Sequence, residues 1–346
     1  MKKYLILGSR IALGVYVPAL ALKKQLEARG DRADMVYMEE LYSGKESVME
    51  ETKRSFHQDF RLAKLSYRLP PRNTNAIDER LKEKLISRLC EWEYDSIILF
   101  SGFWADFVRQ LIHSCPHYKG RIKAIHMDAV PSLSWKGHDC SDMQEHWLFR
   151  LDENRICYSL SPMEKGSDTP SRILVHGGGW GIGDYDEKVT ALNQLGYPLD
   201  IVVYYPDEVR RDDSFNQYYL LDPTWKPDEE KNEFPRMMKY QSGEWIEFGD
   251  RKSASPLTQL LFHAAAILSK PGGGTLCDSI ACGVPMIFTE PLAAYEQANQ
   301  HLWVQQGLGM AYADFIKCDD HDKQLETMRH NIHSLQQRLP VITEIL

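Results

Sequence analysis

The fold is decided by the stretch Ser269-Lys270-Pro271-Gly272-Gly273-Gly274-Thr275-Leu276-Cys277-Asp278, where a buried strand ends and a helix begins. The apolar run at 265–269 predicts the strand, and Thr275 is expected to cap the helix. The glycines let the backbone come close to a ligand, and a helix N-terminus with free N–H groups attracts phosphate. The stretch therefore predicts a phosphate site, and a tight turn without a ligand is the alternative.

Polar side chains that follow this turn have the chemistry that a nucleotide and a sugar require. Asp278 lies one turn inside the helix, where its carboxylate could accept hydrogen bonds from ribose hydroxyls. After a strand at 285–288, Glu290, Glu296, Gln297 and Asn299 return acidic and amide groups to the same strand ends. Sugar hydroxyls need both donors and acceptors, so we expect a sugar to bind at this edge.

Strand and helix patterns alternate on both sides of the turn. Apolar runs predict strands at 3–8, 34–38, 95–101, 121–127, 171–176, 199–205, 245–248, 265–269 and 285–288. Helical spacing predicts helices at 18–29, 105–115, 187–195 and 322–338. Strand–glycine–helix openings near Gly8 and Gly177 indicate an α/β protein with two Rossmann-like domains facing each other across a cleft. The expected units are 1–160, 171–320 and a C-terminal helix within 321–346, with a linker at 152–170.

Composition excludes several classes of protein. The 346 residues hold 41 Lys and Arg against 49 Asp and Glu, a net charge of −8, which argues against nucleic acid as a partner. No apolar stretch reaches the roughly 18 residues of a membrane span. The 7 cysteines are odd in number and form no C-x-x-C pair, which favours reduced thiols and a cytoplasmic location.

The run from Ser269 to Gln300, SKPGGGTLCDSIACGVPMIFTEPLAAYEQANQ, resembles the donor-binding signature of GT-B glycosyltransferases. It is most similar to the group of the peptidoglycan lipid-intermediate N-acetylglucosaminyltransferase and the diacylglycerol glycosyltransferases. The resemblance implies that Lys270 and the turn hold a nucleotide diphosphate, that Asp278 holds the ribose, and that Glu296 and Gln297 contact the sugar. The turn residues it implies are Gly272, Gly273, Gly274 and Thr275. Two positions depart from the pattern: Asp278 replaces a more usual Glu, and Asn299 lies one position early.

A second glycine run, His176 to Gly183, resembles the opening of the donor domain in this family. There Gly178 and Gly179 would bring backbone amides to the diphosphate. The run could equally mark a dinucleotide site, but the acid expected about 20 positions on is not clear, and we favour a sugar nucleotide. Phe248 lies in a segment that resembles the one that binds the base, and a core strand is the alternative.

The acceptor side is expected in the amino-terminal half. The loop from Gly8 to Leu20 resembles the family's G-x-G-G-H-x-x-P-x-L loop, which implies acceptor contacts at Gly14, Val15 and Tyr16. Val15 stands where the family has His. Valine cannot accept a proton, so a base must come from elsewhere or this loop performs no chemistry.

The strand at 121–127 supplies the candidate bases, Asp128 and His126. Asp128 follows the strand directly, and Trp135 lies seven positions on, as in the lipid glycosyltransferases, where the Trp would contact the acceptor. Because an imidazole titrates near neutrality, His126 is the rival base. A turn cap is the alternative role for Asp128, and a structural histidine is the alternative for His126.

The basic, partly apolar segment 52–73 is the remaining feature of note, with a net charge of about +5 if its side chains are fully charged. Segments of this kind in related enzymes touch anionic membranes, which predicts weak membrane contact here. A solvated helix face is the alternative. The cluster from Cys318 to Asp322 lacks the spacing of a metal site, so we expect no metal.

Together these features predict a metal-independent glycosyltransferase. The resemblance implies transfer from a nucleoside-diphosphate sugar, UDP-linked, to a small-molecule or lipid acceptor, with inversion at the anomeric carbon. The nucleotide sugar is a substrate, and no further cofactor is expected. The alternatives are a nucleotide-sugar epimerase or hydrolase on the same scaffold, or a non-catalytic subunit that binds a sugar nucleotide.

Overall fold

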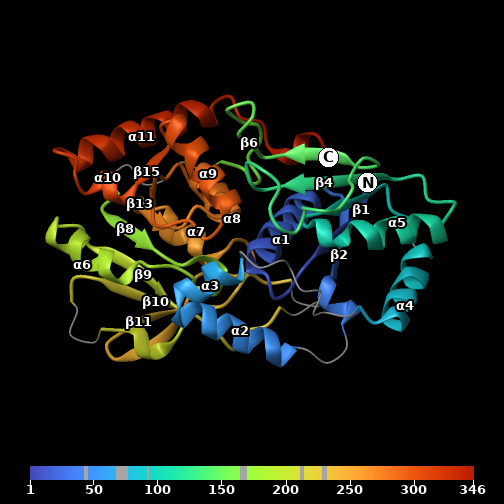
Figure 1. The fold of residues 1–346 in the computed structure, drawn as a ribbon, viewed down its shortest axis with the longest axis horizontal. Coiled ribbons are helices and arrows are strands. Elements are labelled where there is room, and N and C mark those ends of the chain that lie inside the picture. The colour runs from blue at the N-terminus through green and yellow to red at the C-terminus, as the bar shows by residue number, and fades with distance from the viewer. Residues whose placement is uncertain (43–45, 68–76, 92, 164–169, 211–213, 228–231) are drawn as a thin grey trace.

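The computed structural model contains two sheets, each with its own helices, placed side by side (Figure 1). It describes residues 1–42, 46–67, 77–91, 93–163, 170–210, 214–227 and 232–346. The predicted α/β class with two Rossmann-like units is confirmed. We call the sheet of β1–β5 with its helices the first half, and the sheet of β8–β15 with its helices the second half.

The sheet of the first half is parallel throughout, in the order β2-β1-β3-β4-β5. Buried parallel strands are apolar on both faces, and Tyr4 to Leu7 are fully buried for that reason. The strands are β1 (Lys3–Gly8), β2 (Arg32–Tyr37), β3 (Ser96–Leu99), β4 (Arg121–His126) and β5 (Gln144–Trp147). The helices are α1 (Leu13–Ala28), α2 (Glu46–Gln58), α3 (Phe60–Ser66), α4 (Glu79–Cys90) and α5 (Ala105–Ser114).

The sheet of the second half has eight strands in the order β12-β11-β10-β9-β8-β13-β14-β15. Strands β10, β9, β8, β13, β14 and β15 pair parallel, and at one edge β11 pairs antiparallel with both β10 and β12. The strands are β8 (Arg172–Val175), β9 (Leu199–Val203), β10 (Gln217–Leu221), β11 (Met237–Gln241), β12 (Glu244–Phe248), β13 (Ala264–Ser269), β14 (Met286–Phe288) and β15 (Gly309–Ala311). The helices are α6 (Asp186–Gln194), α7 (Pro256–Leu261), α8 (Gly273–Cys282), α9 (Ala294–Gln305), α10 (Tyr312–Phe315) and α11 (His321–Gln336).

Short elements complete the chain. A hairpin of β6 (Phe149–Arg150) and β7 (Arg155–Ile156) follows β5. The 3₁₀ turns are η1 (Met38–Leu41), η2 (Gly102–Trp104), η3 (Gly178–Trp180), η4 (Pro206–Glu208) and η5 (Ile342–Glu344). After α11 the chain returns to the first half, where Lys123 Nζ donates to the carbonyl oxygens of Ile345 and Leu346, both at 3.1 Å. In Figure 1 the C-terminus accordingly lies beside β4 and the N-terminus.

Helices α2 and α3 contain the described part of the basic segment and reach across to the second half (Figure 1). The Phe56 ring lies 6.5 Å from that of Trp180, and Lys64 pairs with Glu290. Residues 68–73 of the segment lie outside the described residues. In the described part of the chain, no helix is long and apolar enough to span a bilayer.

Three expectations from the sequence need correction. Gly272, not Thr275, is the N-cap residue of α8, so Thr275 lies within the first turn. Helix α1 begins at Leu13 rather than at 18, so Pro18 lies inside the helix, where it has no N–H to donate to the Gly14 carbonyl. The sequence predicts reduced thiols, but Cys90 and Cys115 form a disulfide, with Cα atoms 5.5 Å apart. The two cysteines meet because the C-terminal ends of α4 and α5 lie together.

Candidate functional site

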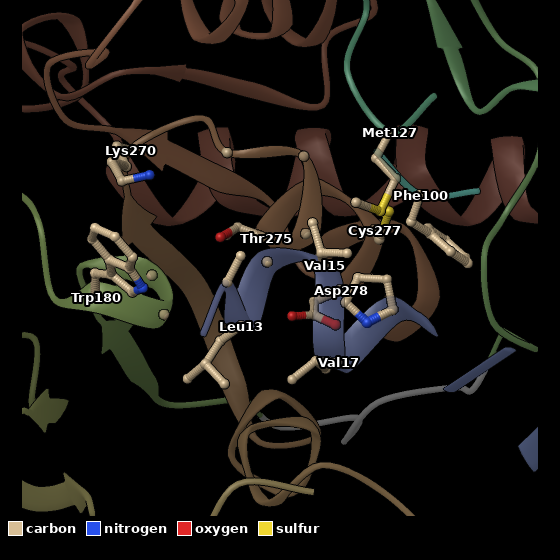
Figure 2. Close-up of a pocket in the computed structure, with 18 of the residues that line it drawn as sticks. Leu13, Val15, Val17, Phe100, Met127, Trp180, Lys270, Thr275, Cys277 and Asp278 are labelled. Carbon is tan, nitrogen blue, oxygen red and sulfur yellow. The ribbon is translucent and has the colours of Figure 1, made fainter. Parts of the chain in front are cut away.

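A cavity of about 720 Å³ lies where α8 of the second half faces α1 of the first half. Figure 2 shows Thr275, Cys277 and Asp278 of α8 opposite Leu13, Val15 and Val17 of α1, with Lys270 and Trp180 at one side. The carboxyl ends of β4, β8 and β13 open onto the same cavity. This is the place where ligands bind in open α/β sheets.

The glycine turn ends β13 and opens α8, as expected from the sequence. Gly272 is the N-cap without a side-chain hydrogen bond, and its own N–H donates to the Lys270 carbonyl at 2.9 Å. A Cβ at Gly274 would meet nothing within 4 Å, so this part of the turn faces open space. The N–H groups of Gly274 and Thr275 have no partner within the helix, because the first residues of a helix never do. Together with the positive end of the helix dipole, these amides favour a negatively charged ligand.

Lys270 brings a positive charge to the same place. Its Nζ lies 2.7 Å from Glu296 Oε1. It also lies beside both glycine turns, since a Cβ on Gly178 or Gly272 would be 3.7 or 3.4 Å from it. Burial is the largest influence and opposes the charge, but Glu296, Tyr67 and Asp128 together outweigh it and raise the pKa of Lys270 above its ordinary value. The ammonium therefore stays charged beside the amides of α8.

The second glycine turn lines the cavity through Gly178 and Gly179. Gly178 has a φ of +72°, a conformation that favours glycine, and its carbonyl accepts a hydrogen bond from the Tyr204 hydroxyl. A Cβ on Gly179 would lie 2.6 Å from Leu13 Cβ, so only glycine allows this turn to pack on α1. The turn thus joins the two halves beside Lys270.

Asp278 faces the cavity from the second turn of α8 (Figure 2). Burial raises the pKa of its carboxyl to about 7. Among the described residues we find no hydrogen-bond donor or cation paired with it. A half-buried carboxylate without a partner carries a desolvation cost, and ligand hydroxyls would satisfy it.

Asp128 also lines the cavity, at the end of β4. Its Oδ1 accepts a hydrogen bond from Asn299 Nδ2 at 2.8 Å, and the backbone N–H of Gly273 interacts with the same carboxylate and favours its charged form. Burial raises the pKa of this carboxyl to about 6. Of the two bases predicted from the sequence, it is the one that the structure places at the cavity.

His126 lies elsewhere, between two indole rings. Its imidazole stacks on Trp147 with ring centres 3.9 Å apart and lies 4.2 Å from the ring of Trp135. Burial lowers the pKa of His126 to about 4. It lines neither of the two cavities described here, so the structure gives it no path to a ligand there.

The residues predicted for the acceptor side also divide into those that line the cavity and one that does not. Gly14, Val15 and Trp135 line the cavity, as expected from the sequence. Tyr16 does not: it is fully buried, and its hydroxyl donates to the Glu233 carbonyl at 2.8 Å. Its side chain packs between Tyr37 and Trp225, which makes it part of the core.

Two donor-side residues line neither cavity, although each is next to a residue that lines the first one: Phe248 pairs with Met237, and Gln297 follows Glu296. Phe248 packs against Tyr219, with ring centres 4.9 Å apart, and Gln297 is exposed on α9. The cavity is instead closed on this side by residues that the sequence analysis did not single out: Leu221, Met237, Ser255, Pro256 and Leu257. A Ser followed by Pro is a helix-start signal that could have placed α7 at this edge.

A second cavity, of about 840 Å³, adjoins the first on the side of the first half. The two share lining residues, among them Val15, Phe103 and Lys270. Most of the other side chains that line it are apolar or aromatic: Ile11, Met38, Tyr42, Tyr67, Trp104, Trp180, Ile182 and Leu292. Glu39 also lines it, but its carboxylate already accepts hydrogen bonds from Ser9 Oγ at 2.6 Å and from the Arg10 N–H at 2.8 Å.

Two Rossmann-like halves that face each other define the GT-B fold, and solved structures of glycosyltransferases share it. MurG of Acinetobacter baumannii is 13% identical, with a TM-score of 0.51 over 99% of this chain and 96% of that one. SsfS6 of Streptomyces sp. SF2575, solved with thymidine diphosphate, is 12% identical, with a TM-score of 0.53 over 100% and 98%.

A third solved structure is UGT89C1 of Arabidopsis thaliana, complexed with UDP-L-rhamnose. It is 13% identical to this chain, with a TM-score of 0.53 over 97% of this chain and 93% of that one. No protein-family model and no curated protein matches the sequence. The comparisons therefore define the fold.

Proposed function

We propose that this protein is a glycosyltransferase that moves a sugar from a nucleoside-diphosphate donor to an acceptor held by the first half. One observation carries the proposal: the α8 N-terminus, with open space at Gly274, and the Lys270 ammonium meet in one cavity on a GT-B fold. Free amides and a fixed cation stabilise the charge that develops on a leaving diphosphate. They would do so without a metal ion.

Support for the donor comes from the chemistry of α8 and from the fold comparison. Asp278 lies one turn beyond the amides of Gly274 and Thr275, a spacing that suits a ribose joined to a diphosphate. Similar folds have been solved with thymidine diphosphate and with UDP-L-rhamnose. We propose UDP as the nucleotide, and dTDP is the first alternative to test.

The apolar second cavity is the proposed acceptor site. Its two charged side chains among the described residues are Glu39 and Lys270, and both are already paired. An uncharged, largely apolar acceptor therefore fits better than a charged one. Leu62 and Leu65 are exposed on α3 beside Arg61, so a lipid acceptor taken from a membrane surface remains part of the proposal.

Asp128 is the proposed base, because it lines the cavity while Val15 cannot accept a proton and His126 lies elsewhere. Its carboxylate would take the proton of the acceptor hydroxyl as that oxygen attacks the anomeric carbon. Attack opposite the leaving diphosphate inverts the configuration at that carbon. The carbon–oxygen bond to the diphosphate breaks, and the diphosphate leaves with the electron pair.

The Val15 position also favours a second candidate, hydrolysis or epimerisation of the nucleotide sugar without an acceptor. To distinguish the two, the purified protein is incubated with UDP-sugars and dTDP-sugars, with and without a panel of apolar alcohols and phenols. Glycosyl transfer predicts nucleotide release that depends on the acceptor, together with a glycosylated product. Free sugar or an epimer formed without an acceptor would favour the second candidate, and absence of any turnover would favour a binding subunit.

A further inference from the structure

Asp128 of the first half hydrogen-bonds to the helix end that is proposed to hold the donor diphosphate. The backbone N–H of Gly273 donates to its carboxylate, and a Cβ on Gly273 would lie 2.9 Å from Oδ1. The same Cβ would lie 2.5 Å from the carbonyl oxygen of Met127. The end of β4 thus contacts the first residue of α8, and a negative side chain interacts with its N-terminus.

The four backbone amides at the start of α8 are consequently divided between partners within the protein and a ligand. The N–H of Gly272 donates to Lys270 O, and that of Gly273 donates to Asp128. Only the amides of Gly274 and Thr275 are left for a ligand. A diphosphate bound there would bring its negative charge next to the carboxylate, and like charges in a buried site repel strongly.

Asn299 of α9 holds the carboxylate in this position. It is fully buried, and its Nδ2 donates to Asp128 Oδ1 at 2.8 Å and to the carbonyl oxygen of Pro271 at 2.9 Å. Its Oδ1 accepts from the N–H of Ala129 at 2.7 Å. The Asn299 side chain therefore links the end of β4 to the glycine turn through both its Nδ2 and its Oδ1.

The charged and titratable groups around Asp128 come from several elements. Glu296 of α9 opposes the negative charge and Lys270 at the end of β13 favours it, while Tyr67, Tyr295 and Cys277 interact with it more weakly. Burial is the largest influence and raises the pKa of Asp128 to about 6. At neutral pH the carboxylate is thus charged but held at a cost, which the Gly273 and Asn299 hydrogen bonds reduce.

We propose that Asp128 occupies part of the diphosphate site in the free protein, and that the donor displaces its carboxylate from the Gly273 amide. The inference rests on the proposed function. Displacement would couple two events: the diphosphate gains the third amide of α8, and the released carboxylate, free of one hydrogen bond, becomes available to an acceptor. Donor binding would thereby prepare the proposed base.

The test measures UDP affinity by calorimetry for the wild type and for Asp128→Asn at pH 8 and pH 5. The substitution keeps the size of the side chain and removes its charge. A hydrogen bond to a charged group changes an equilibrium constant about tenfold or more, so the variant should bind UDP about tenfold more tightly at pH 8. At pH 5 the wild-type carboxyl is protonated, and the two affinities should converge; ionisation of UDP itself affects both proteins equally.

Two matched controls separate charge at α8 from other effects. Gln306→Ala removes the amide of the residue that follows α9, whose Nε2 donates to the carbonyl oxygen of Asn154 between β6 and β7 at 2.8 Å. Asp106→Asn removes an exposed carboxylate of the first half. Neither should change UDP affinity. The inference is wrong if Asp128→Asn binds UDP no more tightly than the wild type, or if a control variant gains as much UDP affinity. If neither UDP nor dTDP binds to any of the proteins, the proposed function itself is wrong.

Discussion

Glu296 holds Lys270 at the cavity: its Oε1 lies 2.7 Å from Lys270 Nζ, while its Oε2 accepts the Leu292 N–H at 2.7 Å. The Glu296 side chain is only 1% exposed, whereas that of Lys270 is 15% exposed and lines the cavity. The pair places a fixed positive charge next to the helix end at Gly274. We therefore assign Glu296 a role in positioning Lys270, whether or not it also contacts the sugar.

Glu296→Gln should destabilise the free protein, because it leaves the buried ammonium without its counter-charge. Breaking buried pairs typically costs about 3 kcal/mol or more. UDP should then raise the Tm of the variant by more than it raises that of the wild type, since the diphosphate supplies the missing charge. Differential scanning fluorimetry with and without UDP measures both effects.

Glu290→Gln is the matched control, because it removes the carboxylate from a more exposed Lys–Glu pair, Lys64–Glu290. Exposed pairs contribute about 0–1 kcal/mol, so its Tm should stay close to that of the wild type. Equal losses in the two variants would contradict the importance assigned to the Lys270 pair.

Gly274→Val should abolish UDP binding and leave the protein folded. A side chain there enters open space at the α8 N-terminus, where the diphosphate is proposed to bind. Gly273 is a poorer choice, because a Cβ would lie 2.5 Å from the Met127 carbonyl oxygen and disturb the contact between the halves. Gly14→Val serves as the control: it also lines the cavity, on α1, and should bind UDP normally by calorimetry.

Asp278→Ala should weaken UDP binding about tenfold to a hundredfold, because a hydrogen bond to a charged group is worth about 1.5–3 kcal/mol. Inorganic pyrophosphate, which has no ribose, should bind the variant and the wild type equally. A parallel loss for pyrophosphate would place Asp278 at the diphosphate instead of the ribose.

The stability of the free protein should also depend on Asp278 through pH. Its pKa is raised from 3.8 to about 7 in the folded state, so between these values the folded protein holds more protons than the unfolded one. Stability therefore falls as pH rises through this window. Asp278→Asn should raise the Tm relative to the wild type at pH 8, with a smaller gain at pH 5. A gain that does not change with pH would show that the carboxyl titrates normally.

The strands that the sequence predicts best are those buried on both faces. Runs such as Lys3–Gly8 and Ala264–Ser269 are apolar at nearly every position, so their bounds are predicted to within one residue. Strand β5, Gln144–Trp147, is at the edge of its sheet and largely exposed, which gives it a polar sequence that predicts no strand. Strand β15, at the edge of the second sheet, is only three residues long.

In the candidate site, the sequence predicts the features that depend on neighbouring residues and misses those that depend on residues far apart in the chain. The turn from Lys270 to Thr275 is local, so its glycines and the following helix were predictable. The contact between Asp128 and Asn299 joins residues 171 positions apart and depends on how the two halves meet. The stack of His126 between Trp135 and Trp147 likewise forms only in the folded first half, and alternation along β4 alone could not place it.

The central claim is that the α8 N-terminus and Lys270 hold a nucleoside diphosphate, and a crystal structure of the protein with UDP tests it most directly. The account predicts phosphate oxygens within hydrogen-bond distance of the Gly274 and Thr275 amides and of Lys270 Nζ, with the ribose at Asp278. UDP bound away from α8, or bound there in the opposite direction with its base at Lys270, would contradict the account.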